Sequence, residues 1–286
     1  MPSNPLSSGA LTFVKNVVYA PAMRHRDFRT LWLSSVFNAI GMTGEQVILG
    51  WVILELTESP FMVGVAMGLR FAPLLVLGFV AGAIADKVDR LNHMRVLTVG
   101  MAVANAALGL LILLDLIAVW HLLVISLVGG SLWAQYMTSR QVFAFDIVGP
   151  ANIVGSLALV RLAMQVGGIA GSLGVGFLLA RFGGDMAYAT LAASYVVSAA
   201  TLLAIRSHTQ TAPTARRPVW RNLVGMGTEM RHNRALLMLV GLAVAAEVLG
   251  APHMAVTPSL AKDVLAVGAG GLGIMTSATF LLIIIG

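Results

Sequence analysis

The sequence predicts an all-α integral membrane protein. Of its 286 residues, 58% are hydrophobic and only 10% are charged, a composition far from that of soluble globular domains. Apolar runs recur along the chain at the length of about 20 residues that a helix needs to cross the hydrocarbon core of a bilayer. Such unbroken runs predict helices, because the strands of a membrane barrel alternate between apolar and polar residues.

The chain holds seven complete predicted spans and the beginning of an eighth near Gly270. Five of these segments are free of charged residues, which makes them the clearest. The other three each contain one charge: Glu45 in the first, Arg70 in the second and Glu247 in the seventh. The predicted spans are, in order, 30–54, 61–85, 96–114, 116–139, 162–180, 186–205, 235–261 and the run 264–286.

Small residues four positions apart predict where helices pack closely. The second span contains two such pairs, Gly64 with Gly68 and Gly78 with Gly82, and the fifth span contains Gly167 with Gly171 and Gly168 with Ser172. Because these residues are small, two helix backbones can approach each other at such positions. We therefore expect close helix packing at these pairs, and not ligand contacts.

The distribution of positive charge predicts the topology. The net charge is +6, from 18 Lys and Arg against 12 Asp and Glu. Most of the basic residues lie before the first span, in the loop before the third, after the fourth, and between the sixth and seventh, whereas the alternate loops hold only Arg181 and Lys262. By the positive-inside rule this is a multi-pass cell-membrane protein with a cytoplasmic N-terminus. Because the basic residues are dispersed over short loops, no nucleic-acid partner is expected.

A polar connector separates the predicted spans into two sets. Residues 207–234 combine Pro, Thr and Arg and lie between the sixth and seventh spans. The predicted organisation is a six-helix transmembrane bundle over 1–206, a cytoplasmic connector over 207–234 and the first two helices of an incomplete second bundle over 235–286. We expect a fragment or an interrupted gene, because Gly286 ends an apolar run. Such a chain is expected to insert into a membrane without transporting alone.

The short loop between the second and third spans contains a motif. Gly82, Asp86, Arg90 and Arg95 resemble the loop motif of the major facilitator superfamily, which reads roughly G-x-x-x-D-R/K-x-G-R-R/K. The segments FRTLWLSSVFNAIGMTGEQV, SPFMVG and GGIAGSLGVGFLLARFG agree with the same superfamily. The whole chain is similar to the first two thirds of such a transporter, in the bacterial exporter branch that includes the enterobactin exporter.

This resemblance implies a fold and a function. The fold is a major-facilitator-like six-helix bundle followed by the start of a second bundle, with substrate held between the two. The function is secondary active transport by alternating access, as an efflux antiporter of the cell inner membrane for a small amphipathic organic molecule such as a siderophore or drug. The resemblance also implies that Asp86 forms a cytoplasmic latch with a helix of the second half. The alternative is that Lys87, Arg90 and Arg95 of this loop only fix the topology.

The sequence departs from the superfamily pattern in two places. Asp89 replaces the second glycine of the loop motif. The span-five antiporter signature contains a Gly-Pro pair, and this chain has Gly171-Ser172 there. The first departure bears on whether the loop has the geometry of the superfamily. The second bears on the expectation of antiport, because the Pro of the antiporter signature is missing.

Glu45 and Arg70 are the first candidate functional residues, because a charge at the bilayer centre costs at least about 2.5 to 3.5 kcal/mol. Glu45 lies ten residues from the outer end of the first span, and Arg70 lies nine residues from the same edge in the second. At a rise of about 1.5 Å per residue, both lie about 14 to 15 Å deep and can pair. A change in their separation would switch the carboxyl between its protonated and ionised forms, as proton coupling requires. The alternative is a static pair that fixes helix register.

Five further residues are predicted to belong to the proton-coupling or substrate cavity. Glu247 is the other deep charge, whereas Arg161 lies near the cytoplasmic end of its span and can reach the interface. Gln165 either lines the cavity or holds two helices together. The five residues are Asn38, Gln46, Arg161, Gln165 and Glu247.

Enzyme function is not expected from this sequence. It has no Cys, its six His show no metal-binding spacing, and no Ser/His/Asp group is concentrated at one depth. We therefore expect no cofactor and no metal, and a small-molecule substrate, the lipid bilayer and protons as partners. The alternative function is a truncated, transport-inactive membrane subunit with a structural or partner-binding role, which a proton-flux assay would distinguish.

Overall fold

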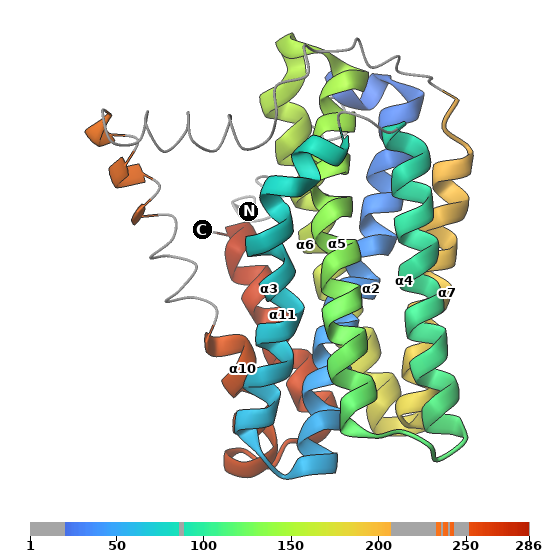
Figure 1. Ribbon diagram of the computed structural model, residues 1–286, viewed down its shortest axis with the longest axis vertical. Coiled ribbons are helices and arrows are strands. Elements are labelled where there is room, and N and C mark those ends of the chain that lie inside the picture. The colour runs from blue at the N-terminus through green and yellow to red at the C-terminus, as the bar shows by residue number, and fades with distance from the viewer. Residues whose placement is uncertain are drawn as a thin grey trace, which may run out of the picture.

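The computed structural model describes residues 21–85, 89–206, 233–235, 237–239, 241–242 and 252–285. Within these residues every long element is a helix and none is a strand, so the predicted all-α class is confirmed (Figure 1). The elements are η1 (Pro21–Arg24), α2 (Arg26–Thr57), α3 (Pro60–Ala85), α4 (Arg90–Leu113), α5 (Val119–Val148), η2 (Pro150–Asn152), α6 (Ile153–Phe182), α7 (Gly184–Leu203), α10 (Pro252–Ser259), η3 (Leu260–Val264) and α11 (Gly268–Ile285).

The six predicted spans of the first set correspond in order to helices α2 to α7. Among the described helices, α2, α4, α5, α6 and α7 are long and apolar enough to cross a membrane, and α3 and α11 contain shorter apolar stretches. Of the predicted seventh span, residues 252–259 form α10, whereas Glu247 lies outside the described residues. Most of the predicted connector, 207–234, lies outside them as well.

The last apolar run becomes helical at Gly268, close to the predicted start near Gly270. Before it, η3 is a π-helical turn, and the backbone then changes hand at Ala266, which has a φ of 50°. Gly268 also has a positive φ of 68°. A right-handed helix cannot continue through such residues, so the chain turns between η3 and α11.

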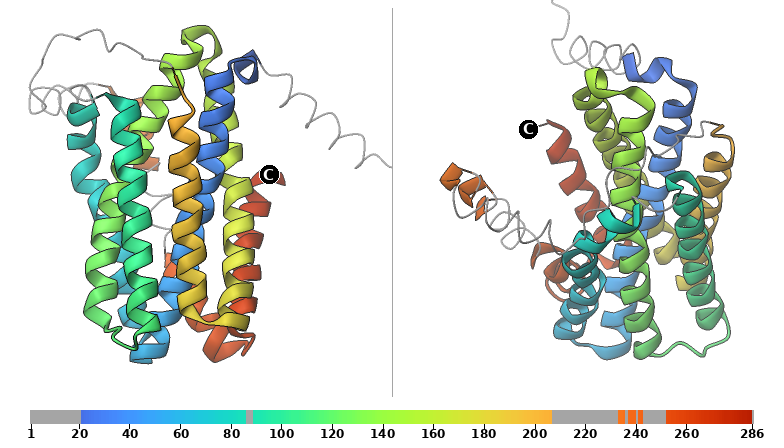
Figure 2. Two further views of the ribbon diagram at one scale, coloured as in Figure 1. Left: turned by 90° about the vertical axis from the view of Figure 1, so that its right-hand side faces the viewer. Right: turned by 45° about the horizontal axis from the view of Figure 1, so that its top comes forward.

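Helix α2 lies at the centre of the bundle. It packs against α6 and α7, while α3 packs against α5, and α4 packs against α5 and α7 (Figures 1 and 2). Helix α11 lies along α6 (Figure 2). We call the end of the bundle that holds the start of α2, the α3–α4 and α5–α6 connections and the end of α7 the basic end, because most of the described arginines lie toward it.

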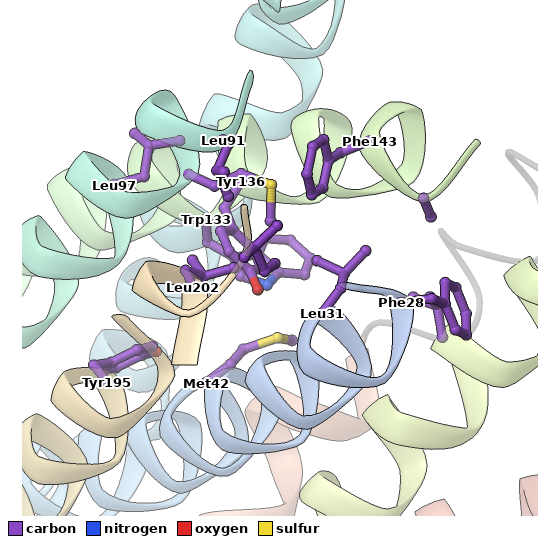
Figure 3. Packing of buried hydrophobic residues seen from close by; sticks show 14 of the residues in the cluster. Phe28, Leu31, Met42, Leu91, Leu97, Trp133, Tyr136, Phe143, Tyr195 and Leu202 are labelled. Atoms are coloured by element: carbon purple, nitrogen blue, oxygen red, sulfur yellow. The ribbon is translucent and has the colours of Figure 1, made fainter. Parts of the chain in front are cut away.

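Two large apolar clusters lie in the described interior, one on each side of the bundle's middle, and a third, small cluster is formed by Val47, Ala261 and Leu272. The cluster toward the basic end is rich in aromatic side chains, among them Phe28, Trp133 and Tyr136 (Figure 3). The other large cluster contains mainly aliphatic side chains, such as Ile48 and Leu108. On α2 the first cluster reaches Met42 and the second begins at Ile48, so the helix turn between them, which contains Glu45, forms a separate layer.

The predicted glycine seam at Gly167 and Gly171 is present. A Cβ added at Gly167 would lie 2.6 Å from the Cβ of Ala39, and one at Gly171 would lie 2.5 Å from the carbonyl oxygen of Ile40. These glycines let α6 approach the backbone of α2, so this prediction is confirmed. The prediction for Gly64 and Gly68 is wrong in the described part of the chain, because a Cβ at either position would meet no atom within 4 Å.

We expect Gly171→Ala to destabilise the protein by about 1–3 kcal/mol, the usual cost of overpacking a tight interior. The added methyl group would meet the backbone of α2, which cannot move without separating the two helices. Gly174→Ala on the same helix is the matched control, because nothing lies within 4 Å of a Cβ there. Thermal unfolding of the detergent-solubilised variants measures the difference, and equal stability of the two would contradict the proposed seam.

Candidate functional site

Glu45 of α2 and Arg70 of α3 form a buried ion pair in the layer between the two apolar clusters. Their exposed fractions are only 3% and 2%. The contact has two branches: Arg70 Nη1 donates to Glu45 Oε1, and Arg70 Nη2 donates to Oε2 at 3.2 Å. This two-pronged geometry is the strongest arrangement of the two side chains. The predicted contact is therefore present, and its functional role stays a prediction.

Two glycines of α5 make room for this pair. A Cβ at Gly130 would overlap the backbone carbonyl of Arg70, so α5 and α3 touch through their main chains. A Cβ at Gly129 would lie 3.1 Å from Glu45 Oε1 and 3.5 Å from Arg70 Nη1. The absence of side chains at these positions lets the guanidinium and the carboxylate meet in the interior.

Two neutral side chains complete the surroundings of Glu45. Asn105 of α4 donates its Nδ2 to Glu45 Oε2 at 3.5 Å and to the Met101 carbonyl at 2.9 Å. Tyr195 of α7 donates its hydroxyl to the same Oε2 at 3.4 Å. The carboxylate of α2 is thus approached by side chains of α3, α4 and α7, of which α7 is far away in sequence.

The polar interior extends from Glu45 toward the basic end. Asn38, seven residues before Glu45 on α2, contacts the sulfur of Met101 at 3.8 Å through its Nδ2. Within the described residues its Oδ1 has no hydrogen-bond partner, and the same is true of Gln46 Nε2 and Asn105 Oδ1. Buried polar atoms normally have a partner, and water often supplies it. These atoms therefore mark places where water or a ligand can bind.

The remaining predicted cavity residues do not join the ion pair. Arg161 is exposed on α6, and Gln165 is half-buried one turn further along the same helix. Glu247 lies outside the described residues. The structure therefore brings together Glu45 and Arg70, with Asn38 and Gln46 on the same helix as Glu45, and leaves Arg161 and Gln165 on a different helix.

The loop motif lies at the basic end. Gly82 belongs to α3, and Asp86 lies outside the described residues. Arg90 pairs with Asp146 of α5. Arg95 donates to the carbonyl oxygen of Leu202, at the end of α7, at 2.9 and 3.2 Å.

Asp89, the residue that departs from the superfamily motif, has a local structural role. Its Oδ1 accepts a hydrogen bond from the backbone N–H of Leu91 at 3.0 Å, so it is the N-cap of α4. Asp is among the preferred residues at this position. The departure from glycine thus starts a helix, and the motif's arginines then connect that helix to α5 and α7.

The described residues contain no group of three or more His, Cys, Asp or Glu side chains placed to bind a metal ion. The chemistry available at Glu45 is therefore that of a single carboxylate with one cation and two neutral donors.

A bundle of membrane-crossing helices around a buried, two-pronged ion pair is a polytopic membrane protein. The sequence model of the transmembrane secretion effector family matches residues 17–286, so the chain belongs to this family of the major facilitator superfamily. Among solved structures, the chain is similar to the crystal structure of PepTSo, a POT family transporter, with a TM-score of 0.54 and 15% identity. The similarity covers 89% of this chain and 54% of that one, so the chain spans about half of PepTSo. The comparison with curated proteins gives no match.

Proposed function

We propose that this chain acts in a proton-coupled secondary transporter that exports a small amphipathic organic molecule, such as a siderophore or a drug. Glu45 is the proton-binding group in this proposal, and Arg70 is the cation that controls it. The observation that supports it is the burial of their ion pair between two apolar clusters. Family membership supports transport as the general activity.

The proposed coupling follows from the chemistry of the pair. Burial disfavours an ionised carboxylate, whereas a nearby guanidinium favours it. If alternating access moves α3 relative to α2, the separation of Glu45 and Arg70 changes, and Glu45 binds or releases a proton. The hydroxyl of Tyr195 and the amide of Asn105 can hold the carboxyl in both forms, because they donate to Glu45 Oε2 without bearing charge.

The proposed topology places the basic end in the cytoplasm, as the positive-inside rule predicts. The cell inner membrane is the location that the resemblance to bacterial exporters implies. In this orientation Asn38 lies on the cytoplasmic side of Glu45. Asp86, which lies outside the described residues, remains the proposed cytoplasmic latch. Arg90 and Arg95 of the same motif hold α4 against α5 and α7 at that end.

The proposal is tested with a full-length transporter that contains these 286 residues, because this chain is not expected to transport alone. The transporter is reconstituted in proteoliposomes that contain a trapped pH-sensitive dye, with equal pH on both sides. Ethidium or 8-anilinonaphthalene-1-sulfonate is added outside; both are amphipathic and permanently charged, so neither transfers a proton across the bilayer by itself. If entry of a probe is exchanged for protons, the interior becomes more alkaline. Protein-free liposomes are the control. Uptake of a probe without alkalinisation would contradict proton coupling, and no uptake of either probe would favour the structural-subunit alternative.

A further inference from the structure

Arg140 of α5 is a fully buried cation that the Glu45 site does not use. Its exposed fraction is 2%, and it lies eight residues before the end of α5 at the basic end. Its Nη1 and Nη2 donate to the sulfur atoms of Met164 and Met137, each at 2.8 Å, and its Nε has no hydrogen-bond partner within the described residues. No carboxylate in the described part of the chain forms an ion pair with it.

This surrounding does not compensate the charge of Arg140. A guanidinium remains charged in proteins, and a thioether sulfur is only a weak acceptor. The ring of Tyr136 lies 5.6 Å from the guanidinium carbon and adds a cation–π contact, which contributes far less than an ionic partner. Arg70 shows the contrast, because it is equally buried but has a carboxylate on two of its nitrogens. Arg140 is therefore a donor group without an anion.

A second cation lies beside it. Arg161 of α6 is one turn from Met164, the residue whose sulfur contacts Arg140, and the two arginines are close enough to interact electrostatically. Arg161 is exposed. Arg161 lies seven residues, or about two turns, before Gly168, so the two residues share a face of α6. A Cβ at Gly168 would meet Phe280, so this face is turned toward α11. The buried arginine thus has an exposed arginine next to it.

We propose that Arg140 and Arg161 form a binding site for an amphipathic oxyanion, which enters between α5 and α6 from the basic end. Arg161 attracts the anion at the exposed position, and the unused donors of Arg140 bind it inside. A guanidinium matches the two oxygens of a carboxylate or phosphate group. The side chains of Tyr136, Met137 and Met164 provide the apolar surface for the rest of the molecule, since thioethers adapt to irregular shapes.

This site is separate from the proposed proton site. Glu45 and Arg70 belong to α2 and α3, whereas the oxyanion site belongs to α5 and α6. Binding is therefore tested without transport, and a failure of proton coupling would leave the oxyanion site untouched.

The test is isothermal titration of the protein in a neutral detergent with benzoate and with benzamide, its neutral isostere. We expect benzoate to bind and benzamide to bind at least tenfold more weakly. Arg140→Met should weaken benzoate binding at least tenfold; Met removes the charge but keeps an unbranched apolar side chain beside Met137 and Met164. Arg161→Met should weaken it as well, and it keeps the test decisive if the Arg140 variant does not fold.

One variant serves as the control. Arg181→Met removes an exposed arginine from the other end of α6 and should bind benzoate like the wild type. The proposal is overturned if the wild type does not bind benzoate, if benzamide binds equally well, or if both site variants keep the wild-type affinity. Titration in phosphatidylcholine nanodiscs with and without phosphatidylglycerol identifies the source: weaker benzoate binding with the anionic lipid assigns the site to a lipid headgroup, and unchanged binding assigns it to a soluble organic anion.

Discussion

In the full-length transporter, Glu45→Gln is expected to reduce proton-coupled transport to the level of protein-free liposomes while leaving the protein inserted and folded. Gln has the size of Glu and keeps one carbonyl oxygen as an acceptor for Arg70, but it cannot bind or release a proton. It imitates the protonated carboxyl, which a proton-coupled cycle must visit, so the fold has to tolerate it. The trapped-dye assay measures the loss, and size-exclusion chromatography of the purified variant verifies folding.

Glu55→Gln is the matched control for this experiment. Glu55 is on the same helix, but it is exposed, and its Oε1 accepts a hydrogen bond from Trp51 at 2.5 Å. Its neutralisation should leave coupling unchanged, because the carboxylate lies outside the polar layer. If Glu45→Gln retained wild-type coupling, the proposed proton-binding role would be wrong, and Glu247 would be the next carboxylate to test.

The sequence was sufficient to predict the helices and the pairing of Glu45 with Arg70, for simple physical reasons. The bilayer fixes the length of a span, and the position of a charge within the span fixes its depth. When two opposite charges lie at the same depth on consecutive helices, pairing with each other is the most direct way to avoid an uncompensated charge in the bilayer. This prediction needs only two helices that are consecutive in the sequence. It holds for α2 and α3 because the connection between them is short.

The other partners in the site could not be predicted in this way. Tyr195 reaches Glu45 across 150 positions of sequence, and nothing in its local sequence distinguishes it from Tyr188, which is also buried. Asn105 had a weak signal, as a lone amide in a charge-free span. Asp146 pairs with Arg90 because α4 and α5 pack together at the basic end, and this depends on the crossing of the helices.

The glycines show that the sequence is also a limited guide to helix packing. Gly64 and Gly68 have the spacing of a seam but face open space in the described structure, whereas Gly129 and Gly130, which are adjacent in sequence, lie against the ion pair. The spacing of glycines shows which face of a helix lacks large side chains. It does not show whether another helix lies there, because that depends on the packing of the whole bundle.

Arg70→Ala is expected to destabilise the protein more than Gly171→Ala, because it leaves the Glu45 carboxylate buried without its cation. Removing one partner of a buried ion pair costs about 3–5 kcal/mol. The neutral donors Asn105 and Tyr195 remain, but they lie at 3.5 and 3.4 Å and bear no charge. The loss should be greater at alkaline than at acidic pH, since a proton can neutralise the unpaired carboxyl in acid. For the same reason, the pH profile of transport should shift upward.

A double-mutant cycle separates the charge effect from the loss of packing. Glu45→Gln combined with Arg70→Ala has no unpaired charge, so it should be more stable than Arg70→Ala alone and should lose the pH dependence of the single variant. Arg181→Ala, which removes an exposed arginine, should change stability by less than about 1 kcal/mol. Unfolding of each variant is followed in detergent at acidic and alkaline pH. If Arg70→Ala were as stable as the double variant at both pH values, Glu45 would already be neutral in the folded protein. The proton would then be bound without control by Arg70, and the proposed coupling would have to be abandoned.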